Sequence, residues 1–544
     1  TILYHIQFKL VFSYAMILQV NRQVHFNKKI PFLIFIICFT VFVFSSDGHR
    51  YSFDEDVAFQ QSYRIVTFED DPTYIPGESR IFFEFPWLFP PEHNNRAICQ
   101  NGILCSGTYI FHSVTQVPFI LVNHVFNIIS DDDVIWTIED FDDFHYINWR
   151  NSIASDSIFL ELFYGPFFTA LSVFVLFLIC RSYGISLQNT IFVSFIYAFT
   201  TMAWAYSQTS LSSPPMIFLV LLGFYYYRNW NMTNSPKYLL FSGISFCLGF
   251  LTRPDTIFII IPLFFLILYL LRSRKEKIKS LLGFIIPTFS GYGIYHMINY
   301  IRFGPPTSIQ VVDSINGVAS GTNSNPILMN IFGLFFSPGV GLFVFSPILM
   351  GLFVGFYDFY KKYKSDCILL VGFIFMFAYT FASGEFWHGL NGWGPRYLLP
   401  LIPFLLIPIA FSLEKRGIVF KLLLIVLGGM GFFINLVYLL QDTHWFVWGF
   451  MGDDSRGLYS LARKEDGGVF PIWINPLVIW SFEFNQLTQS IMWMFGKLQV
   501  DLFLLKLLGI TTYIIAFLTL FTIPVYLLTK EIFSIKKLEK SSNL

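Results

Sequence analysis

Five charged residues have the types and positions that could do chemistry at a membrane surface. Asp54, Glu55 and Asp56 follow an apolar run, while Arg253 stands in the segment LTRPD and Arg396 in the segment NGWGPRY. A carboxylate can remove a proton from an attacking hydroxyl, and arginine forks can hold a phosphate and stabilise it as it departs. These groups would suit a substrate that carries a phosphate, provided that the fold brings them together.

The composition of the 544-residue chain is that of an integral membrane protein. Hydrophobic residues make up 55% of the chain and charged residues only 13%, and the mean hydropathy is +0.59. Soluble globular proteins carry about 25% charged residues. The net charge is zero, with 35 basic and 35 acidic residues, so no global field favours nucleic acid as a partner.

Apolar runs long enough to cross a bilayer recur along the chain, since a span needs about 20 residues. We predict about twelve spans, near residues 30–45, 157–180, 188–204, 213–227, 238–252, 255–271, 281–300, 328–356, 366–383, 396–412, 417–440 and 502–529. The predicted fold is therefore an all-α polytopic membrane protein, a bundle of about twelve transmembrane helices with a large first extracytoplasmic loop.

Basic residues orient this bundle, because lysine and arginine in short loops stay cytoplasmic. With about twelve spans, the strong basic clusters all fall on one side, and both termini are cytoplasmic. These clusters include RSRKEKIK (272–279), KKYK (361–364) and EKR (414–416). The charged candidates at 54–56, 253 and 396 then lie together on the opposite, outer side.

The same count divides the chain into five parts. Residues 1–29 form a cytoplasmic N-terminus, 30–440 the transmembrane core with the outer loop 46–157, 441–501 a second extracytoplasmic segment, 502–529 the last span and 530–544 a basic cytoplasmic tail. Two interpretations of the start stay open, translation from Met16 or a fragment of a longer chain. Residues 1–21 are therefore assigned no function, and whether residues 1–15 are native stays open.

The outer loop 46–157 is strongly acidic, with 18 Asp and Glu, five Arg and no Lys. Its apolar stretches 82–90 and 117–129 predict amphipathic elements on the membrane surface. Cys99 and Cys105 lie in this loop, and we expect a disulfide or no special role, since no nearby pair completes a metal site.

Each candidate residue also has a purely structural explanation. Acidic residues after a first span commonly keep a loop soluble, and an arginine such as Arg253 or Arg396 can anchor a helix end. Glu161 lies near the start of its predicted span, where its carboxylate can reach the surface at little cost. The sequence contains no Walker, dinucleotide-binding, zinc-protease or nucleophile-elbow motif, so no nucleotide cofactor is indicated.

Five short motifs add a resemblance to a known family. They are FDED (53–56), GFLTRPD (249–255), INYIRFGPP (298–306), SPGVGLFVFSPIL (337–349) and GWGPRYLLPLIPFL (392–405). In its motifs and span order, over about residues 30–440, the chain resembles the C-type (GT-C) membrane glycosyltransferases. Within them it is most similar to the protein O-mannosyltransferase and lipid A aminoarabinose transferase (family 39-like) group.

The resemblance implies roles for particular residues. The family's Asp-Glu pair falls on Asp54 and Glu55, which makes Asp54 the expected general base and Glu55 its expected catalytic partner. A basic residue after the fifth or sixth span, often lysine in the family, falls on Arg253 and would contact the donor phosphate. Arginine in place of lysine departs from the family's pattern, and it leaves the geometry at the phosphate open.

The surroundings of Arg396 predict a substrate pocket. We assign Arg396 to phosphate or sugar contact from its charge and location, with a Gly-Pro before it and aromatic residues on both sides. Trp393, Tyr397, His388 and Glu385 are the expected lining of this pocket.

Metal dependence stays open at this point. Some relatives bind a divalent metal through acids of the first loop, and Asp54, Asp56 and His49 are the candidate ligands in this chain. No cofactor is firmly expected.

The sequence therefore predicts an inverting glycosyltransferase that moves a sugar from a polyprenyl-phosphate-linked donor to an acceptor hydroxyl on the outer membrane face. Its partners would be the lipid-linked donor, a lipid, glycan or protein acceptor, and membrane lipids, without nucleic acid. A secondary transporter of a small or lipid-linked solute and a noncatalytic membrane assembly partner stay open as alternatives. Only the SPG and SP turns near 337 and 346 suit the broken helix of a transporter.

Overall fold

The computed structural model describes residues 29–48, 53–67, 109–130, 154–303, 326–384, 387–389, 392–440, 476–497, 500 and 502–542. Within these ranges every regular element is a helix, as expected for an all-α membrane protein. Seven of the described helices are long and apolar enough to span a membrane: 158–182, 254–271, 277–302, 364–382, 396–413, 418–439 and 503–535. The chain is therefore a multi-pass membrane protein.

The helices follow the predicted spans closely. The matching elements are α3 (Lys29–Phe44), α9 (Ala154–Ser182), α10 (Leu187–Thr200), α12 (Ser213–Thr233), α13 (Pro236–Thr252), α14 (Ile257–Leu271), α15 (Lys277–Phe303), α20 (Lys364–Ala382), α21 (Ile402–Leu413), α22 (Ile418–Leu439) and α27 (Phe503–Ser542). The last helix is longer than expected, because it continues through most of the segment predicted as a separate basic tail.

The predicted span 328–356 is wrong as a single helix. The chain instead forms α17 (Ile327–Phe336), α18 (Leu342–Phe345), the 3₁₀ turn η3 (Pro347–Gly351) and α19 (Leu352–Lys362). Pro338 and Pro347 stand at the two breaks, where proline cannot supply the N–H of a continuing helix. Ser337 Oγ accepts a 3.1 Å hydrogen bond from Val340 N, and Ser346 Oγ accepts one of 3.1 Å from Met202 N. Side-chain oxygens thus satisfy backbone donors inside the bundle.

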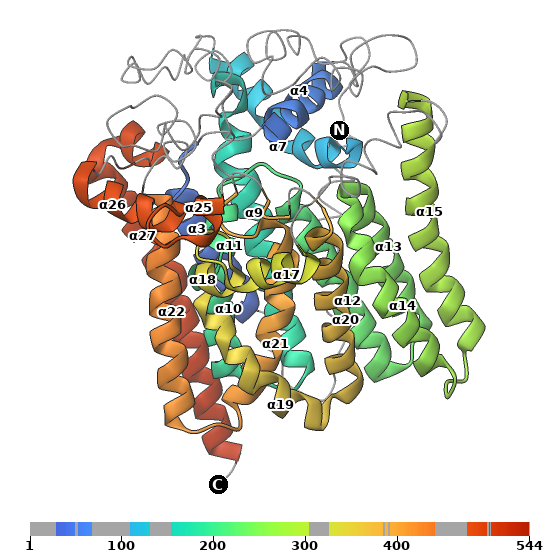
Figure 1. Ribbon diagram of the computed structural model, residues 1–544. Helices are drawn as coiled ribbons and strands as arrows, with labels where there is room; N and C mark the ends of the chain where they lie inside the picture. Colours follow the sequence, from blue (N-terminus) through green and yellow to red (C-terminus); the bar gives the residue numbers. More distant parts are fainter. Residues whose placement is uncertain are drawn as a thin grey trace.

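The basic clusters gather at one end of the bundle. The turns between α14 and α15, between α19 and α20, and between α21 and α22 lie at the lower end of Figure 1, as does the C-terminal end of α27. Lys29 at the start of α3 forms a 3.1 Å ion pair with Glu531 of α27. The helices α4 (Phe53–Thr67) and α7 (Ile110–Ser130) lie at the opposite, upper end. The compartment that each end faces stays a prediction.

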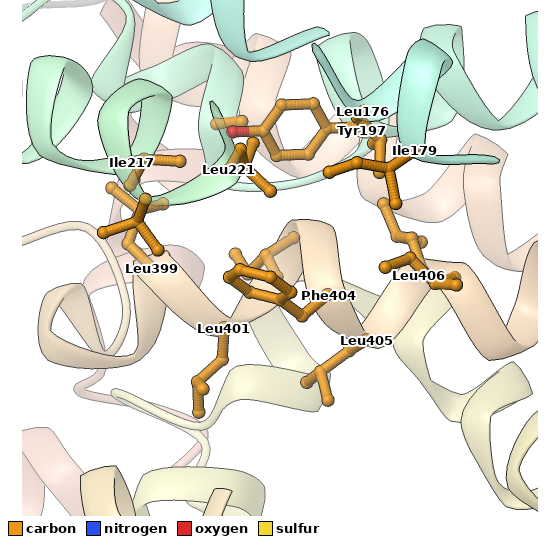
Figure 2. Close-up of a cluster of buried hydrophobic side chains, with 14 of the residues drawn as sticks. Leu176, Ile179, Tyr197, Ile217, Leu221, Leu399, Leu401, Phe404, Leu405 and Leu406 are labelled. Carbon is orange, nitrogen blue, oxygen red and sulfur yellow. The ribbon is translucent and has the colours of Figure 1, made fainter. Parts of the chain in front are cut away.

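The core of the bundle is built around α21, which is buried along its whole length. Figure 2 shows side chains of α21 and of the preceding turn η4 (Arg396–Leu401) facing side chains of α9, α10 and α12, among them Leu176, Ile179, Tyr197, Ile217, Leu221, Leu399, Leu401, Phe404, Leu405 and Leu406. Close packing of this kind holds membrane helices together. It fixes η4, and with it Arg396, relative to α12.

Helix α7 has its polar face buried and its apolar face exposed. His112 and Gln116 are at most 3% exposed, whereas Val122 and Val125 are 53% and 51% exposed. The stretch 117–129 is thus an amphipathic helix as predicted, and its location on a membrane surface stays a prediction. The stretch 82–90 lies outside the described residues, as do Cys99 and Cys105.

Candidate functional site

A buried polar loop forms the centre of the candidate site. Residues 207–212, here called the polar loop, join α11 (Ala203–Tyr206) to α12, and Ser207, Gln208 and Ser210 are at most 1% exposed. Gly165 of α9 packs against the loop backbone, since a Cβ there would lie 2.3 Å from Ser207 O and 2.5 Å from Thr209 O. The absence of a side chain at 165 therefore lets α9 approach the loop directly.

Glu55 of α4 forms a hydrogen bond with this loop. It is 1% exposed, and its Oε1 accepts a 2.8 Å hydrogen bond from Ser210 N. Ser210 O accepts a 2.9 Å bond from Gln116 Nε2 and lies 2.9 Å from His112 Nε2. Side chains of α4 and α7 thus engage both backbone groups of Ser210, which explains why a polar loop can be buried.

The other acidic candidates fall outside the described side chains. Asp54 precedes Glu55 on α4, but the structure describes neither its side chain nor that of Asp56, and His49 lies outside the described residues. Within the described part of the chain, no group of three or more His, Cys, Asp or Glu residues could hold a metal ion. The metal site predicted at these three positions therefore stays a prediction.

Arg253 binds the start of α12, directly after the polar loop. Its Nε donates to Asp255 Oδ2 at 2.6 Å and its Nη1 donates to Ser213 Oγ at 2.8 Å. Nη2 makes no hydrogen bond with the described residues, and the side chain is 16% exposed. Burial, the largest influence, acts to lower the pKa of Arg253, but Asp255, through its charge and its hydrogen bond, and Tyr109 together raise it. Arg253 is thus a fixed cation with one nitrogen available.

Arg396 is enclosed by a glycine-rich segment. Gly389 has φ +85° and a Cβ there would lie 3.0 Å from Arg396 Cγ, so glycine is needed for both conformation and space. The guanidinium carbon lies 5.4 Å from the centre of the Tyr397 ring, and that ring stacks on Phe381 at 4.3 Å. The aromatic residue predicted beside Arg396 therefore supports its side chain, as a cation–π partner.

The side chains of two other residues of the predicted pocket, His388 and Trp393, are buried. His388 and Trp393 are each 2% exposed, and the Trp393 ring packs against Phe345 and Tyr438 with centroid distances of 5.1 Å. Burial, and then the charge of Arg396, lower the pKa of His388 to about 4. His388 is therefore a neutral neighbour of Arg396 near pH 7, while Glu385 lies outside the described residues.

Tyr206 lies close to Arg396 and is not among the residues predicted from the sequence. A Cβ at Gly392 would lie 2.7 Å from the Tyr206 hydroxyl and 3.0 Å from Arg396 Cδ, so these two groups flank one glycine. Burial raises the pKa of Tyr206, while Arg396 and Arg253 both act to lower it. The only signal in the sequence is a tyrosine next to SQTS, which resembles an ordinary aromatic at a membrane interface.

The structure thus gathers three predicted site residues around one short segment. Glu55 contacts Ser210, Arg253 contacts Ser213, and Arg396 lies beside Tyr206. Glu161, by contrast, is 3% exposed inside the bundle, so the expectation that its carboxylate reaches the surface is wrong. An anionic group would find two guanidinium groups at this place.

Residues 147–290 match the model of the dolichyl-phosphate-mannose-protein mannosyltransferase family. The matched region contains α9 to α14, and therefore Tyr206, the polar loop and Arg253. Over these residues the chain is similar to the C-type membrane glycosyltransferases. The resemblance predicted from the motifs is confirmed, and the two arginines can be considered against the chemistry of such transferases.

Among solved structures, the chain is similar to the archaeal oligosaccharyltransferase AglB from Archaeoglobus fulgidus, whose structure holds an inhibitory peptide and a dolichol-phosphate. The identity is 9% and the TM-score 0.40, and the similarity covers 79% of this chain and 59% of AglB. The chain thus spans less than two thirds of that protein's length. The comparison with curated proteins gives no match.

Proposed function

We propose that the chain is an inverting glycosyltransferase that moves a sugar from a polyprenyl-phosphate-linked donor to an acceptor hydroxyl. The reaction takes place outside the cytoplasm, at the end of the bundle that carries α4, α7 and the polar loop. The observation that carries the proposal is the meeting of Arg253 and Arg396 around residues 206–213. The family match over 147–290 supports the same class of donor.

The reaction is a single displacement. The acceptor hydroxyl gives its proton to Asp54, and its oxygen attacks the anomeric carbon of the sugar. The bond between that carbon and the phosphate oxygen breaks, and its electron pair leaves with the polyprenyl phosphate. Arg253 and Arg396 stabilise the charge that develops on this phosphate.

The network around Arg253 prepares it for this role before the donor arrives. Arg253 Nε donates a hydrogen bond to Asp255 and Nη1 donates one to Ser213. Nη2 is therefore left to bind the phosphate of the sugar donor. A charged group that is already held in place needs no reorganisation during the reaction. The departure from lysine to arginine is therefore accommodated by two extra hydrogen bonds that a lysine could not make in this geometry.

Glu55 receives a different role from Asp54 in this mechanism. Its carboxylate accepts a hydrogen bond from Ser210 N, and the residue is almost completely buried. Glu55 acts through the polar loop, which leads to Ser213 and Arg253, and it is therefore a positioning residue. Asp54 remains the residue that we propose as the base.

The break between α17 and α19 is the described feature that would suit a transporter. Residues 337–351 contain no charged side chain, and Ser337 and Ser346 already accept hydrogen bonds from backbone N–H groups. The described residues there offer no ion site of the kind that coupled transport uses. The arginines lie elsewhere, at the polar loop.

The test is transfer of a labelled sugar from polyprenyl-phosphate donors by the purified full-length protein. We expect transfer by the wild type, strong loss in Asp54→Asn, and no loss in Glu276→Gln, which changes an exposed carboxylate at the opposite end. The anomeric configuration of the product, measured by NMR, checks inversion. Equal activity of Asp54→Asn and wild type would remove Asp54 from its role, and a retained configuration would exclude a single displacement.

A further inference from the structure

Two exposed cations lie beside one tyrosine at the lower end of the bundle, away from the candidate site. Lys361 Nζ lies 4.0 Å from the centre of the Tyr357 ring, and Tyr357 is 58% exposed. A hydrogen bond from Lys361 and its charge, together with the charge of Arg416, lower the pKa of the Tyr357 hydroxyl. Both cations therefore lie close to this hydroxyl.

A buried carboxylate holds the guanidinium group of Arg416. Its Nε donates to Asp358 Oδ2 at 2.7 Å and its Nη2 donates to Asp358 Oδ1 at 2.9 Å, while Ser412 Oγ donates to the same carboxylate at 2.9 Å. The Asp358 side chain is 8% exposed and that of Arg416 is 39% exposed. Arg416 Nη1 has no hydrogen-bond acceptor among the residues that the structure describes. Arg416 is thus a fixed cation at the surface.

The acid next to Arg416 in the chain is engaged elsewhere. Glu414 Oε1 accepts hydrogen bonds from Ser186 N at 2.8 Å and from Asn189 Nδ2 at 2.6 Å, at the start of α10. Lys361 and Arg416 are both exposed, so their charges remain accessible. This surface is therefore complementary to an anion.

Exposed apolar side chains adjoin the two cations. Phe353 precedes Tyr357 by one turn of α19 and is 66% exposed. Helix α22, which is long and apolar enough to span a membrane, begins two residues after Arg416, and Val419 in its first turn is 78% exposed. Cations beside aromatic and apolar side chains are typical of the boundary between a bilayer and water.

We propose that Lys361, Arg416 and Tyr357 bind the phosphate of an anionic membrane phospholipid, whose acyl chains lie against Phe353 and α22. A phosphate joined to a hydrocarbon tail matches both the basic and the apolar part of this surface, whereas a free phosphate matches only the basic part. Basic pockets beside membrane helices bind lipid head groups in the same way. Lysines that only orient a protein in the membrane need neither the contact with Tyr357 nor a guanidinium fixed by Asp358. Binding here does not depend on the proposed transfer reaction.

Photo-crosslinking in nanodiscs tests what covers this surface. The full-length protein carries p-benzoylphenylalanine in place of Phe353, in discs with equal parts of phosphatidylglycerol and phosphatidylcholine, and mass spectrometry gives the ratio of the two lipid adducts. The same replacement at Phe265 of α14, which is 63% exposed, reports the surrounding bilayer. We expect the share of phosphatidylglycerol to be about fivefold higher at 353 than at 265, the effect of roughly one basic residue near anionic lipid.

Variants at position 361 test whether the cation causes this enrichment. Lys361→Gln should bring the lipid ratio at 353 close to the ratio at 265, and Lys361→Arg should retain the enrichment because it keeps the charge. Lys275→Gln is the matched control, since it makes the same charge change at an exposed lysine in the turn between α14 and α15. It should leave the enrichment unchanged. All three variants keep the ion pair of Arg416 with Asp358.

Several results would overturn the proposal. Equal lipid ratios at 353 and 265 in the protein that retains Lys361, or an equal loss in Lys361→Gln and Lys275→Gln, would leave only a general effect of surface charge. Crosslinks to a second copy of the chain instead of lipid would make this surface an interface between copies. Loss of the enrichment in inorganic phosphate at the concentration of the phosphatidylglycerol would assign the site to free phosphate. No sugar transfer is measured, so failure here leaves the proposed function untouched.

Discussion

Two buried arginine clusters at opposite ends of the bundle use the same residue types in different ways. In the lower cluster, Arg228 Nη1 donates to Asp366 Oδ2 at 2.8 Å, and the two side chains are 5% and 6% exposed. Tyr183 and Tyr227 donate their hydroxyls to the same carboxylate at 3.0 and 3.2 Å. In the upper cluster, the Tyr206 hydroxyl and Arg253 Nη2 have no hydrogen-bond acceptor among the residues that the structure describes.

The two clusters differ in whether the described residues supply an acceptor for the tyrosine hydroxyls. At the lower end Asp366 accepts from Arg228 Nη1 and from both tyrosines, although Arg228 Nε has no partner among the described residues. At the upper end the described residues supply no acceptor for the Tyr206 hydroxyl. Helix α12 joins both clusters, with Ser213 bonded to Arg253 at its start and Arg228 near its end. One helix therefore carries a buried ion pair and contacts a residue of the proposed site.

The largest effect is expected from breaking the lower cluster. Asp366→Asn leaves the Arg228 charge buried without its counterion, and this should lower the free energy of unfolding by about 3–5 kcal/mol. Denaturant unfolding in detergent measures the loss. Transfer activity per folded molecule should stay at the wild-type level, and Arg228→Met combined with Asp366→Leu should restore much of the stability. Wild-type stability of Asp366→Asn alone would contradict a closed structural cluster.

Removing a cation from the upper cluster should act on catalysis instead. Arg396→Gln should lower kcat/KM for the lipid-linked donor by about 100- to 1,000-fold, the range seen when one group that stabilises developing negative charge is lost. The unfolding free energy should change little by comparison. Steady-state kinetics across donor concentrations provide the measurement. Retention of full activity by a folded Arg396→Gln protein would mean that the upper cluster does not hold the phosphate.

The upper cluster should also make stability depend on pH, through His388 beside Arg396. The pKa of His388 is about 4 in the folded chain and about 6.5 in the unfolded one, so the unfolded chain binds more protons between these values. Stability should therefore fall by about 2–3 kcal/mol as the pH drops from 6.5 to 4. His388→Gln should flatten this profile. Identical profiles for His388→Gln and wild type would refute the assignment.

The smallest effect should come from Glu55→Gln. The amide oxygen of glutamine can still accept the hydrogen bond from Ser210 N, so activity and stability should stay within about threefold and 1 kcal/mol of the wild type. Glu55→Ala should lose about 1–3 kcal/mol of stability, because it leaves that N–H unpaired. Transfer assays and unfolding curves distinguish the two variants. An inactive but stable Glu55→Gln protein would give Glu55 a catalytic role.

The fold was largely predictable because membrane helices leave a strong pattern in the sequence. The spans predicted at 238–252 and 417–440 correspond to α13 at 236–252 and α22 at 418–439. The span predicted at 328–356 failed because a broken apolar helix has the same hydropathy as an intact one. Arg253 and Arg396 were found because charged residues beside apolar runs are conspicuous. Tyr206 was missed because its burial leaves no trace in the pattern.

The sequence by itself determined which segments enter the membrane and that the basic clusters share one end, since both depend on the local run of apolar and charged residues. Only the tertiary structure decided that the polar loop folds inward. Glu55 and Ser210, which hold that loop, are 155 positions apart in the chain. Contacts across such separations depend on how helices pack. The meeting of Arg253, Arg396 and Tyr206 is therefore a property of the packed bundle and of no single segment.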